Sequence, residues 1–405
     1  MGVNKKLRVI CSLIIAVLAA NLGGGSPKAH AAVDAWSIVP SPGRCSTDNT
    51  LYGVAAVSAN DVWAVGYCQI GSFGQSYSLT EHWNGTNWSQ VLSPDFDATT
   101  VLRGVAAVST SDVWAVGNTA TEGGVESTLI LRWNGASWNR VPSPNVPGTS
   151  NRLNSVAVVN STQVWAVGYS GSGVTRRTLT MRWNGIQWSI VPAPNPSVPG
   201  STDDYLSSVS ASPIGDVKAV GSYFNGTKTQ TLVLHWDRVL NTWLAPATPN
   251  IGAGSNYLNA ITVITSDTDA WAVGYYYDAN GKQRTLTMRW NGQLWSVVSS
   301  PNSGGDNNIL HAVAPISSSY LWSVGEFYKP PYATLTERWN GTTWSIVGSP
   351  NYATSHHTLW GVAVVPGTSV CAGGDVWAVG TYTSGNVPET LILRYTLSAS
   401  CSVEP

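Results

Sequence analysis

The sequence has 405 residues, a formal net charge of −1, only 11% charged residues, 40 Gly and 20 Trp. This charge balance does not fit proteins that bind nucleic acids or anionic membrane surfaces, because both classes need a strongly positive surface. Few charges together with abundant Gly, Ser, Thr, Asn and Trp favour short strands joined by tight turns over helices.

Residues 1–31 are predicted to form a signal peptide. Basic residues between Lys5 and Arg8 precede the apolar run Val9–Ala20, which is too short to span a bilayer. The small residues around Ala31 supply a cleavage pattern. Four of the 21 basic residues and none of the 22 acidic residues lie in this segment, so the remaining chain has a net charge of −5. No later stretch reads as a membrane helix, and we expect a secreted, extracellular monomer.

Residues 32–405 are predicted to be one domain made of seven copies of a repeat. The copies open with Leu-x-Gly/Ser-Val-Ala or a variant of it, as in 51–55, and continue with Asp-Val-Trp-Ala-Val-Gly or a variant of it, as in 61–66. After a variable loop it contains Thr-Leu-x-x-Arg-Trp-Asn-Gly-x-x-Trp-Ser-x-Val, as in the segment that begins at Thr285. Each copy thus contains four short runs bounded by turn residues, and Asn-Gly between the last two is a strong hairpin signal because Gly and Asn tolerate positive φ. The pattern predicts an all-β, seven-bladed β-propeller with four-stranded antiparallel blades.

Tryptophan recurs in the second, third and fourth strands of the repeat, and of the 20 Trp residues only Trp360 lies off this pattern. Such a recurrence predicts packing between neighbouring blades. The residue before the third-strand Trp is basic, and an acid opens the second strand in five copies, so we expect these two positions to pair. Lys218 replaces the second-strand Trp in the fourth copy. Drift of one repeat and a ligand-linked lysine both remain open interpretations.

The two ends of the repeat array complement each other. Residues 36–42 form a fourth strand with nothing before it, and the last copy stops after its third strand, 390–395. We expect residues 36–40 to pair with 390–395, complete blade seven and remove an exposed sheet edge.

Four cysteines follow the predicted signal peptide, and export permits them to form disulfides. Four cysteines allow three pairings. The propeller topology favours Cys45–Cys68 on one face and Cys371–Cys401 on the other, each beside the junction of the chain ends.

The Trp-Ala-Val-Gly and Trp-Asn-Gly motifs resemble those of tryptophan-rich β-propeller proteins exported by bacteria. With about fifty residues per unit, the repeat is also similar to the kelch and galactose-oxidase central-domain group. The likeness covers nearly all of 32–405. Kelch repeats carry a Gly-Gly pair after the second strand, whereas this sequence has a single Gly, such as Gly66. The resemblance implies the fold and assigns no catalytic residue.

One position varies while its neighbours repeat: the residue after the opening Leu of each copy. We expect it to surround the mouth of the central channel on the loop-rich face, where it is occupied by Tyr52, Arg103, Asn154, Ser207, Asn259, His311 and Trp360. Aromatic residues in the loops after the second strands add Tyr275, Tyr328 and Tyr332 as candidate ligand contacts.

A non-catalytic binding module is the preferred functional interpretation. An enzyme needs convergent acids, bases or metal ligands, but the acids are scattered, His356 and His357 are adjacent and point apart, and no catalytic motif is present. We therefore predict no catalytic residue, metal or cofactor. Aromatic faces beside polar groups suit a glycan or another cell-surface ligand. The alternatives are a protein–protein interaction or architectural extracellular domain, and a hydrolase or lyase with its site on the same face.

Overall fold

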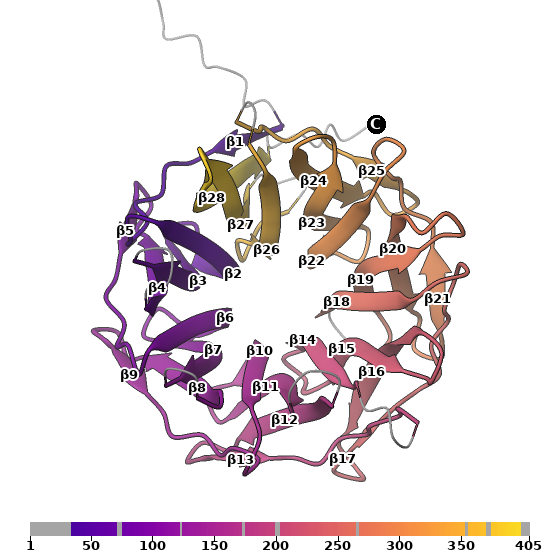
Figure 1. Cartoon of the computed structure of the whole chain (residues 1–405), viewed down its shortest axis with the longest axis horizontal. Helices are drawn as coiled ribbons and strands as arrows, with labels where there is room; N and C mark the ends of the chain where they lie inside the picture. The colour runs from indigo at the N-terminus through magenta and orange to yellow at the C-terminus, as the bar shows by residue number, and fades with distance from the viewer. Residues whose placement is uncertain are drawn as a thin grey trace, which may run out of the picture.

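The computed structural model describes residues 34–70, 75–121, 124–171, 175–198, 203–264, 267–352, 355–369 and 374–397. In these ranges all regular structure is β, with 28 strands in six sheets. Five sheets have four strands, and the sixth consists of two four-stranded antiparallel groups joined by one parallel bridge between Ser76 and Thr99. The groups form a ring with the first strand of each group innermost (Figure 1). The expected all-β class with antiparallel four-stranded units is confirmed.

The strands occupy the same four places in each group. The innermost strands are β2 (Asp48–Ser58), β6 (Thr99–Ser109), β10 (Asn151–Asn160), β14 (Tyr205–Ala211), β18 (Asn256–Val263), β22 (Asn308–Ser317) and β26 (His357–Val364). The second strands are β3 (Asp61–Gln69), β7 (Asp112–Ala120), β11 (Gln163–Ser170), β15 (Val217–Phe224), β19 (Ala270–Tyr277), β23 (Tyr320–Tyr328) and β27 (Gly374–Ser384). The third strands are β4 (Ser76–Trp83), β8 (Ser127–Trp133), β12 (Arg177–Trp183), β16 (Thr229–Asp237), β20 (Gln283–Trp290), β24 (Tyr332–Trp339) and β28 (Val387–Leu397). The outer strands are β5 (Trp88–Gln90), β9 (Trp138–Arg140), β13 (Trp188–Ile190), β17 (Thr242–Leu244), β21 (Trp295–Val298), β25 (Trp344–Ile346) and β1 (Ala35–Ile38).

Two sequence predictions lie outside the described residues: the signal peptide with its cleavage near Ala31, and the Cys371–Cys401 disulfide. Within the described ranges, no helix is long and apolar enough to cross a membrane.

The Asn-Gly hairpins form between the third and outer strands, but the two residues have different roles. Gly85 has a φ of 95°, a value that favours glycine. Asn84 has no positive φ; its side-chain Oδ1 instead accepts hydrogen bonds from the backbone N–H groups of Thr86 (2.9 Å) and Asn87 (3.0 Å). The predicted hairpin is therefore present, with positive φ used by the Gly alone, while the Asn stabilises the turn through its side chain.

Tryptophans pack between neighbouring groups, as expected. Trp63 of β3 is 1% exposed, and its ring centroid lies 4.9 Å from Trp133 and 5.2 Å from Trp138 of the next group. The same three-ring contact is made by Trp114 with Trp183 and Trp188, Trp165 with Trp236 and Trp243, Trp271 with Trp339 and Trp344, and Trp377 with Trp83 and Trp88. Each second-strand Trp therefore helps to hold two groups together.

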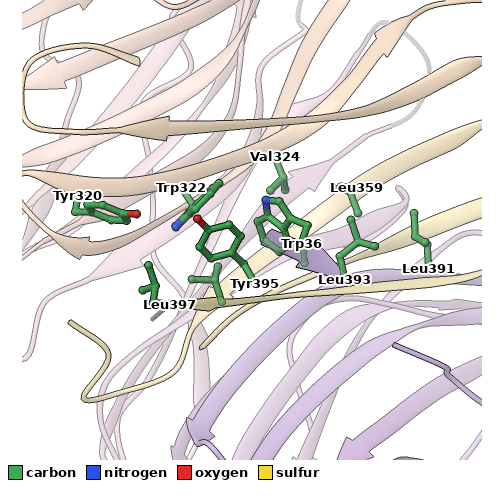
Figure 2. Packing of buried hydrophobic residues seen from close by; sticks show 11 residues of the cluster. Trp36, Tyr320, Trp322, Val324, Leu359, Leu391, Leu393, Tyr395 and Leu397 are labelled. Carbon is green, nitrogen blue, oxygen red and sulfur yellow. The ribbon is translucent and has the colours of Figure 1, made fainter. Parts of the chain in front are cut away.

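The first strand of the chain pairs with the last, and we call this pairing the seam. β1 runs antiparallel to β28, with Trp36 opposite Tyr395. The Trp36 ring is 5% exposed and lies 5.2 Å from Trp322 and 5.4 Å from Tyr395, centroid to centroid (Figure 2). The seam thus places the first residues described by the structure against the end of the repeat array.

The segment that follows β1, residues 41–45, attaches the seam to the first group. The Ser41 hydroxyl donates to Glu81 (2.8 Å), and the Gly43 N–H donates to the same carboxyl (3.0 Å). The Arg44 guanidinium pairs with Asp95 at 2.6 Å. The predicted disulfide between Cys45 and Cys68 is present.

The expected pairs of basic and acidic residues form in five of the groups, and Gln163 and Tyr320 take the place of the acid in the other two. Arg132 makes a bidentate ion pair with Asp112, at 2.7 and 2.8 Å. Equivalent contacts join His82 to Asp61, His235 to Asp216, Arg289 to Asp269 and Arg394 to Asp375. Where the acid is replaced by Tyr320, its hydroxyl accepts a bond from Arg338 at 3.2 Å. These pairs recur around the ring, which supports a structural role.

Candidate functional site

Each innermost strand carries a β-bulge at the residue after its opening Leu. In β2, Leu51 lies opposite Gly66, the register resumes at Gly53, and Tyr52 has no partner on β3. The same register shift recurs in β6, β10, β14, β18, β22 and β26. A Cβ on Gly66 would lie 1.8 Å from the carbonyl oxygen of Thr50. The single Gly of the Trp-Ala-Val-Gly motif is therefore required by this close approach, and the bulge re-aims the variable side chain.

The bulge residues converge on one central cavity of about 180 Å³. We call them the channel ring: Tyr52, Arg103, Asn154, Ser207, Asn259, His311 and Trp360. All are half-buried. The small residue that follows each of them allows the innermost strands to approach one another; a Cβ on Gly104 would lie 2.9 Å from the Cα of Ser155. The structure thus brings together the position that varied in the sequence.

Aromatic side chains gather on the side of the channel ring nearest the seam. Trp360 lies 4.3 Å from the His311 ring and 5.9 Å from the Tyr52 ring. Tyr52 in turn stacks with Tyr67 at 5.8 Å, and the Arg103 guanidinium lies 5.3 Å from the Tyr52 ring centroid. Each of these rings is already in contact with another aromatic or cationic group.

The polar members of the channel ring are oriented by neighbours. The side-chain amide groups of Asn154 and Asn259 each donate to a backbone carbonyl of the next group, at 2.8 Å. The imidazole of His311 lies 3.9 Å from Glu326, which also accepts a hydrogen bond from Thr358. Burial raises the pKa of Glu326, but His311 and Thr358 outweigh burial and hold this pKa below its usual value.

The other candidate ligand contacts lie elsewhere. Tyr275 stacks on Tyr257 at 4.7 Å with an interplanar angle of 14°, and burial raises its pKa. Tyr332 lines a second cavity of about 420 Å³. The ring centroid of Tyr328 lies 5.0 Å from that of Tyr332. The candidates therefore divide into the channel ring, one tyrosine stack and one separate cavity.

Two buried carboxyls of third strands have the raised pKa values that catalytic acids often show. Glu81 and Glu337 are both 0% exposed and occupy the same position of the repeat. Burial raises the pKa of Glu81 to about 7, against the hydrogen bonds from Ser41 and Gly43. Burial alone raises the pKa of Glu337 well above its usual range, and within the described residues neither of its oxygens has a hydrogen-bond partner. Neither residue lines either cavity, so we assign both to the fold.

Replacing Glu337 with Met is expected to stabilise the protein. Two other copies of the repeat have Met at this position, Met181 and Met288. The free energy of unfolding should rise by about 1–3 kcal/mol at pH 5, because an unpartnered buried carboxyl is removed. The gain should be larger at pH 8. Because the folded pKa of Glu337 is raised, the wild type loses stability as pH rises above the unfolded value, and the Met variant does not. Urea denaturation at the two pH values measures both effects.

The matched control is Glu81→Met. It should gain less, because the Gly43 N–H would lose its acceptor. An unchanged or lower free energy of unfolding for Glu337→Met at both pH values would contradict this assignment.

Lys218 lies in a buried cluster that the sequence pattern did not show. Its ammonium is 1% exposed and bonds Asp216 at 2.6 Å and Asp267 at 2.9 Å. His235 contacts the same two carboxylates at 3.0 and 3.3 Å. Two aspartates and one histidine at these distances could hold a metal ion, but the lysine ammonium already provides the balancing cation. The Lys218 Nζ also lies 5.8 Å from the Trp290 ring of the next group.

Comparison with solved structures identifies the architecture. A structure of YCF48 bound to D1 peptide superposes with a TM-score of 0.54 at 14% identity, covering 90% of this chain and 97% of that chain. YCF48 from Cyanidioschyzon merolae gives 0.53 at 14% identity, with 89% and 98% covered. The chain has a β-propeller fold. A protein of unknown function from Dyadobacter fermentans also superposes, with a TM-score of 0.50 at 10% identity, covering 89% and 98%. Comparison with known family models found no match, and comparison with curated protein sequences found none either.

Proposed function

We propose that this chain is a secreted, seven-bladed β-propeller that binds a protein partner without catalysis through its channel ring. The observation that carries the proposal is the convergence of the variable bulge residues on one cavity. Residues that vary within a repeating framework, and that the bulge excludes from the strand ladder, are available for recognition.

The blade count and the closure rest on the arrangement of strands. Each four-stranded group corresponds to one copy of the repeat, and the last copy obtains its outer strand from β1. Pairing β1 with β28 covers an edge that would otherwise present unpaired N–H and C=O groups. Location outside the cytoplasm is supported by the Cys45–Cys68 disulfide, a bond typical of oxidising compartments.

A polypeptide suits the channel ring better than a sugar. Sugar rings stack on open aromatic faces, but the rings of Tyr52, Trp360 and Tyr275 already lie against other side chains. The cavity of about 180 Å³ is smaller than the roughly 300–1,000 Å³ typical of small-molecule sites. It would therefore admit one side chain or the end of a chain. The YCF48 structure with a bound peptide supports the view that a fold of this kind can accept a peptide.

Peptide selection from a random display library, run beside a glycan array, tests the proposal. Peptides should bind the wild type, and the double variant Tyr52→Ala/Trp360→Ala should lose at least about tenfold in affinity, equivalent to about 1.4 kcal/mol. The expected loss follows from removing two aromatic contacts at the centre of the surface.

Tyr328→Ala is the control, because it removes an aromatic residue beside the second cavity and should leave peptide affinity unchanged. Circular dichroism and the unfolding midpoint report whether the variants fold. Undiminished peptide binding by a folded double variant would place the site elsewhere. Clean glycan binding without peptide binding would favour the lectin-like alternative.

A further inference from the structure

Arg103 places a positive charge in the central cavity, and none of the acidic side chains that the structure describes forms an ion pair with it. It projects from the bulge of β6, is half-buried and lines the cavity. Among the residues that the structure describes, its one side-chain hydrogen bond is made by Nε to Asn118, and it forms no ion pair. Burial and the nearby Arg152 both lower the pKa of Arg103. Glu126 partly opposes this lowering, but it is paired with Arg152, so Arg103 is a desolvated cation without an ion-pair partner of its own in the described ranges.

Other arginines of the same face are neutralised. Arg152 pairs with Glu126, with Nε 3.1 Å from the carboxylate. Arg176 makes a bidentate pair with Asp203, at 2.6 and 2.9 Å. The Arg284 Nε lies 2.9 Å from Asp278. Each of these three neighbours of the cavity face has its own acid, whereas Arg103 has none among the described residues.

Neutral groups hold the Arg103 guanidinium in place. The Asn118 Oδ1 accepts its Nε–H at 3.3 Å, while the Asn118 amide donates to Glu126 at 3.2 Å. Asn118 thus bridges Arg103 and Glu126, an acid of the same four-stranded group. The ring of Tyr52 supports the guanidinium at 5.3 Å. A positioned guanidinium whose terminal Nη groups have no partner in the described ranges is suited to bidentate binding of a carboxylate.

The rest of the channel ring favours a carboxylate carried by a polypeptide. The amide groups of Asn154 and Asn259 already donate to backbone carbonyls, so their Oδ1 atoms are left as acceptors for peptide N–H groups. Glu326, which lies on β23 behind the cavity lining, is 3.9 Å from His311 and accepts a hydrogen bond from Thr358, across the ring from β6 (Figure 1). The negative group of a ligand is therefore directed toward Arg103.

We propose that Arg103 anchors a carboxylate of the bound polypeptide, either an acidic side chain or a chain terminus, at the mouth of the central cavity. This inference rests on the proposed function and adds the chemistry of the ligand. The carboxylate would accept two parallel N–H bonds from the guanidinium fork, as in arginine–carboxylate pairs within proteins.

The test uses defined peptides. Acetyl-Ala-Glu-Ala-amide and acetyl-Ala-Gln-Ala-amide differ by one charge, and acetyl-Ala-Ala-Ala with a free C-terminus places the carboxylate at the chain end. Titrations followed by NMR should show at least about tenfold tighter binding for one or both carboxylate peptides than for the glutamine peptide. The preference should weaken as salt is added.

Arg103→Gln should remove this preference, and Arg103→Lys should keep part of it, because lysine retains the charge but not the fork. Arg140→Gln is the matched control, because Arg140 is exposed on β9 and its guanidinium lies over Phe96. Circular dichroism of each variant reports folding, and the lysine variant provides the test should the glutamine variant fail to fold.

The outcomes separate the two proposals. If peptides bind but the carboxylate gives no advantage, or if the advantage survives in Arg103→Gln, the anchor is wrong and the proposed function stands. If acetate alone binds as tightly as the carboxylate peptides, the site takes a free anion and the polypeptide ligand is wrong. If neither these peptides nor library peptides bind, both proposals fail.

Discussion

Removing residues 34–40 is expected to destabilise the protein more than any single core substitution. The deletion removes β1, exposes the edge of β28 and takes Trp36 out of its contacts with Trp322 and Tyr395. Losing a buried Trp alone costs about 3–5 kcal/mol, so we expect a loss of more than about 5 kcal/mol for the whole strand. Urea denaturation measures the loss, and faster hydrogen exchange in β28 should accompany it.

A synthetic peptide with the sequence of residues 34–40 is expected to restore part of the lost stability. The same peptide with Ala at position 36 is the control and should not, because it lacks the ring that packs on Trp322. An unchanged unfolding midpoint after the deletion would show that the seam contributes little, and the inferred closure would then need another explanation.

Lys218→Met is expected to cost about 3–5 kcal/mol, because removing one partner of a buried ion pair leaves the other charge without compensation. Asp216 is 2% exposed. Burial raises its pKa, but the bonds from His235 and Lys218 outweigh burial and hold the pKa below its usual value. Without the lysine this carboxylate would keep only His235 of these two partners.

Lys218→Trp should cost much less than Lys218→Met. At the equivalent position of the first group, Trp63 lies beside the His82–Asp61 pair. Trp290 and Trp295 of the fifth group are available to complete a three-ring contact with a Trp at position 218. Urea denaturation of both variants decides the matter. A Met variant as stable as the wild type, or a Trp variant less stable than the Met variant, would contradict the view that Lys218 replaces a packing tryptophan.

Much of the fold could be predicted from the sequence because the residue pattern of each strand recurs in several copies of the repeat. Alternating apolar residues, turn residues and Trp recur at the same places, so a signal that is weak in one copy is strengthened by the others. The pairing of basic and acidic residues could be predicted for the same reason. What the repeat could not show is the role of Asn84, because a side-chain bond to the turn and a positive φ favour the same residue type.

The candidate site was harder to predict, because residues that contact each other from different copies form no motif of fixed spacing in the sequence. The variable position indicated the channel ring, but not the bulge that produces it or the missing counter-charge of Arg103. Tyr275 was expected at the ligand surface, yet Tyr257, a cross-strand neighbour, covers its face. The contact between Lys218 and Asp267 joins two copies, so neither copy alone contains the signal.

At the bulge of each innermost strand, different residues determine the backbone conformation and the side chain that faces the cavity. The glycine opposite the bulge and the leucine before it specify the backbone, while the residue between them lies outside the strand ladder. Substitutions at the channel ring can therefore alter what the cavity accepts without changing how the strands pair. A propeller built in this way can change its binding specificity by substitutions at the bulge positions, while the backbone of every strand stays the same.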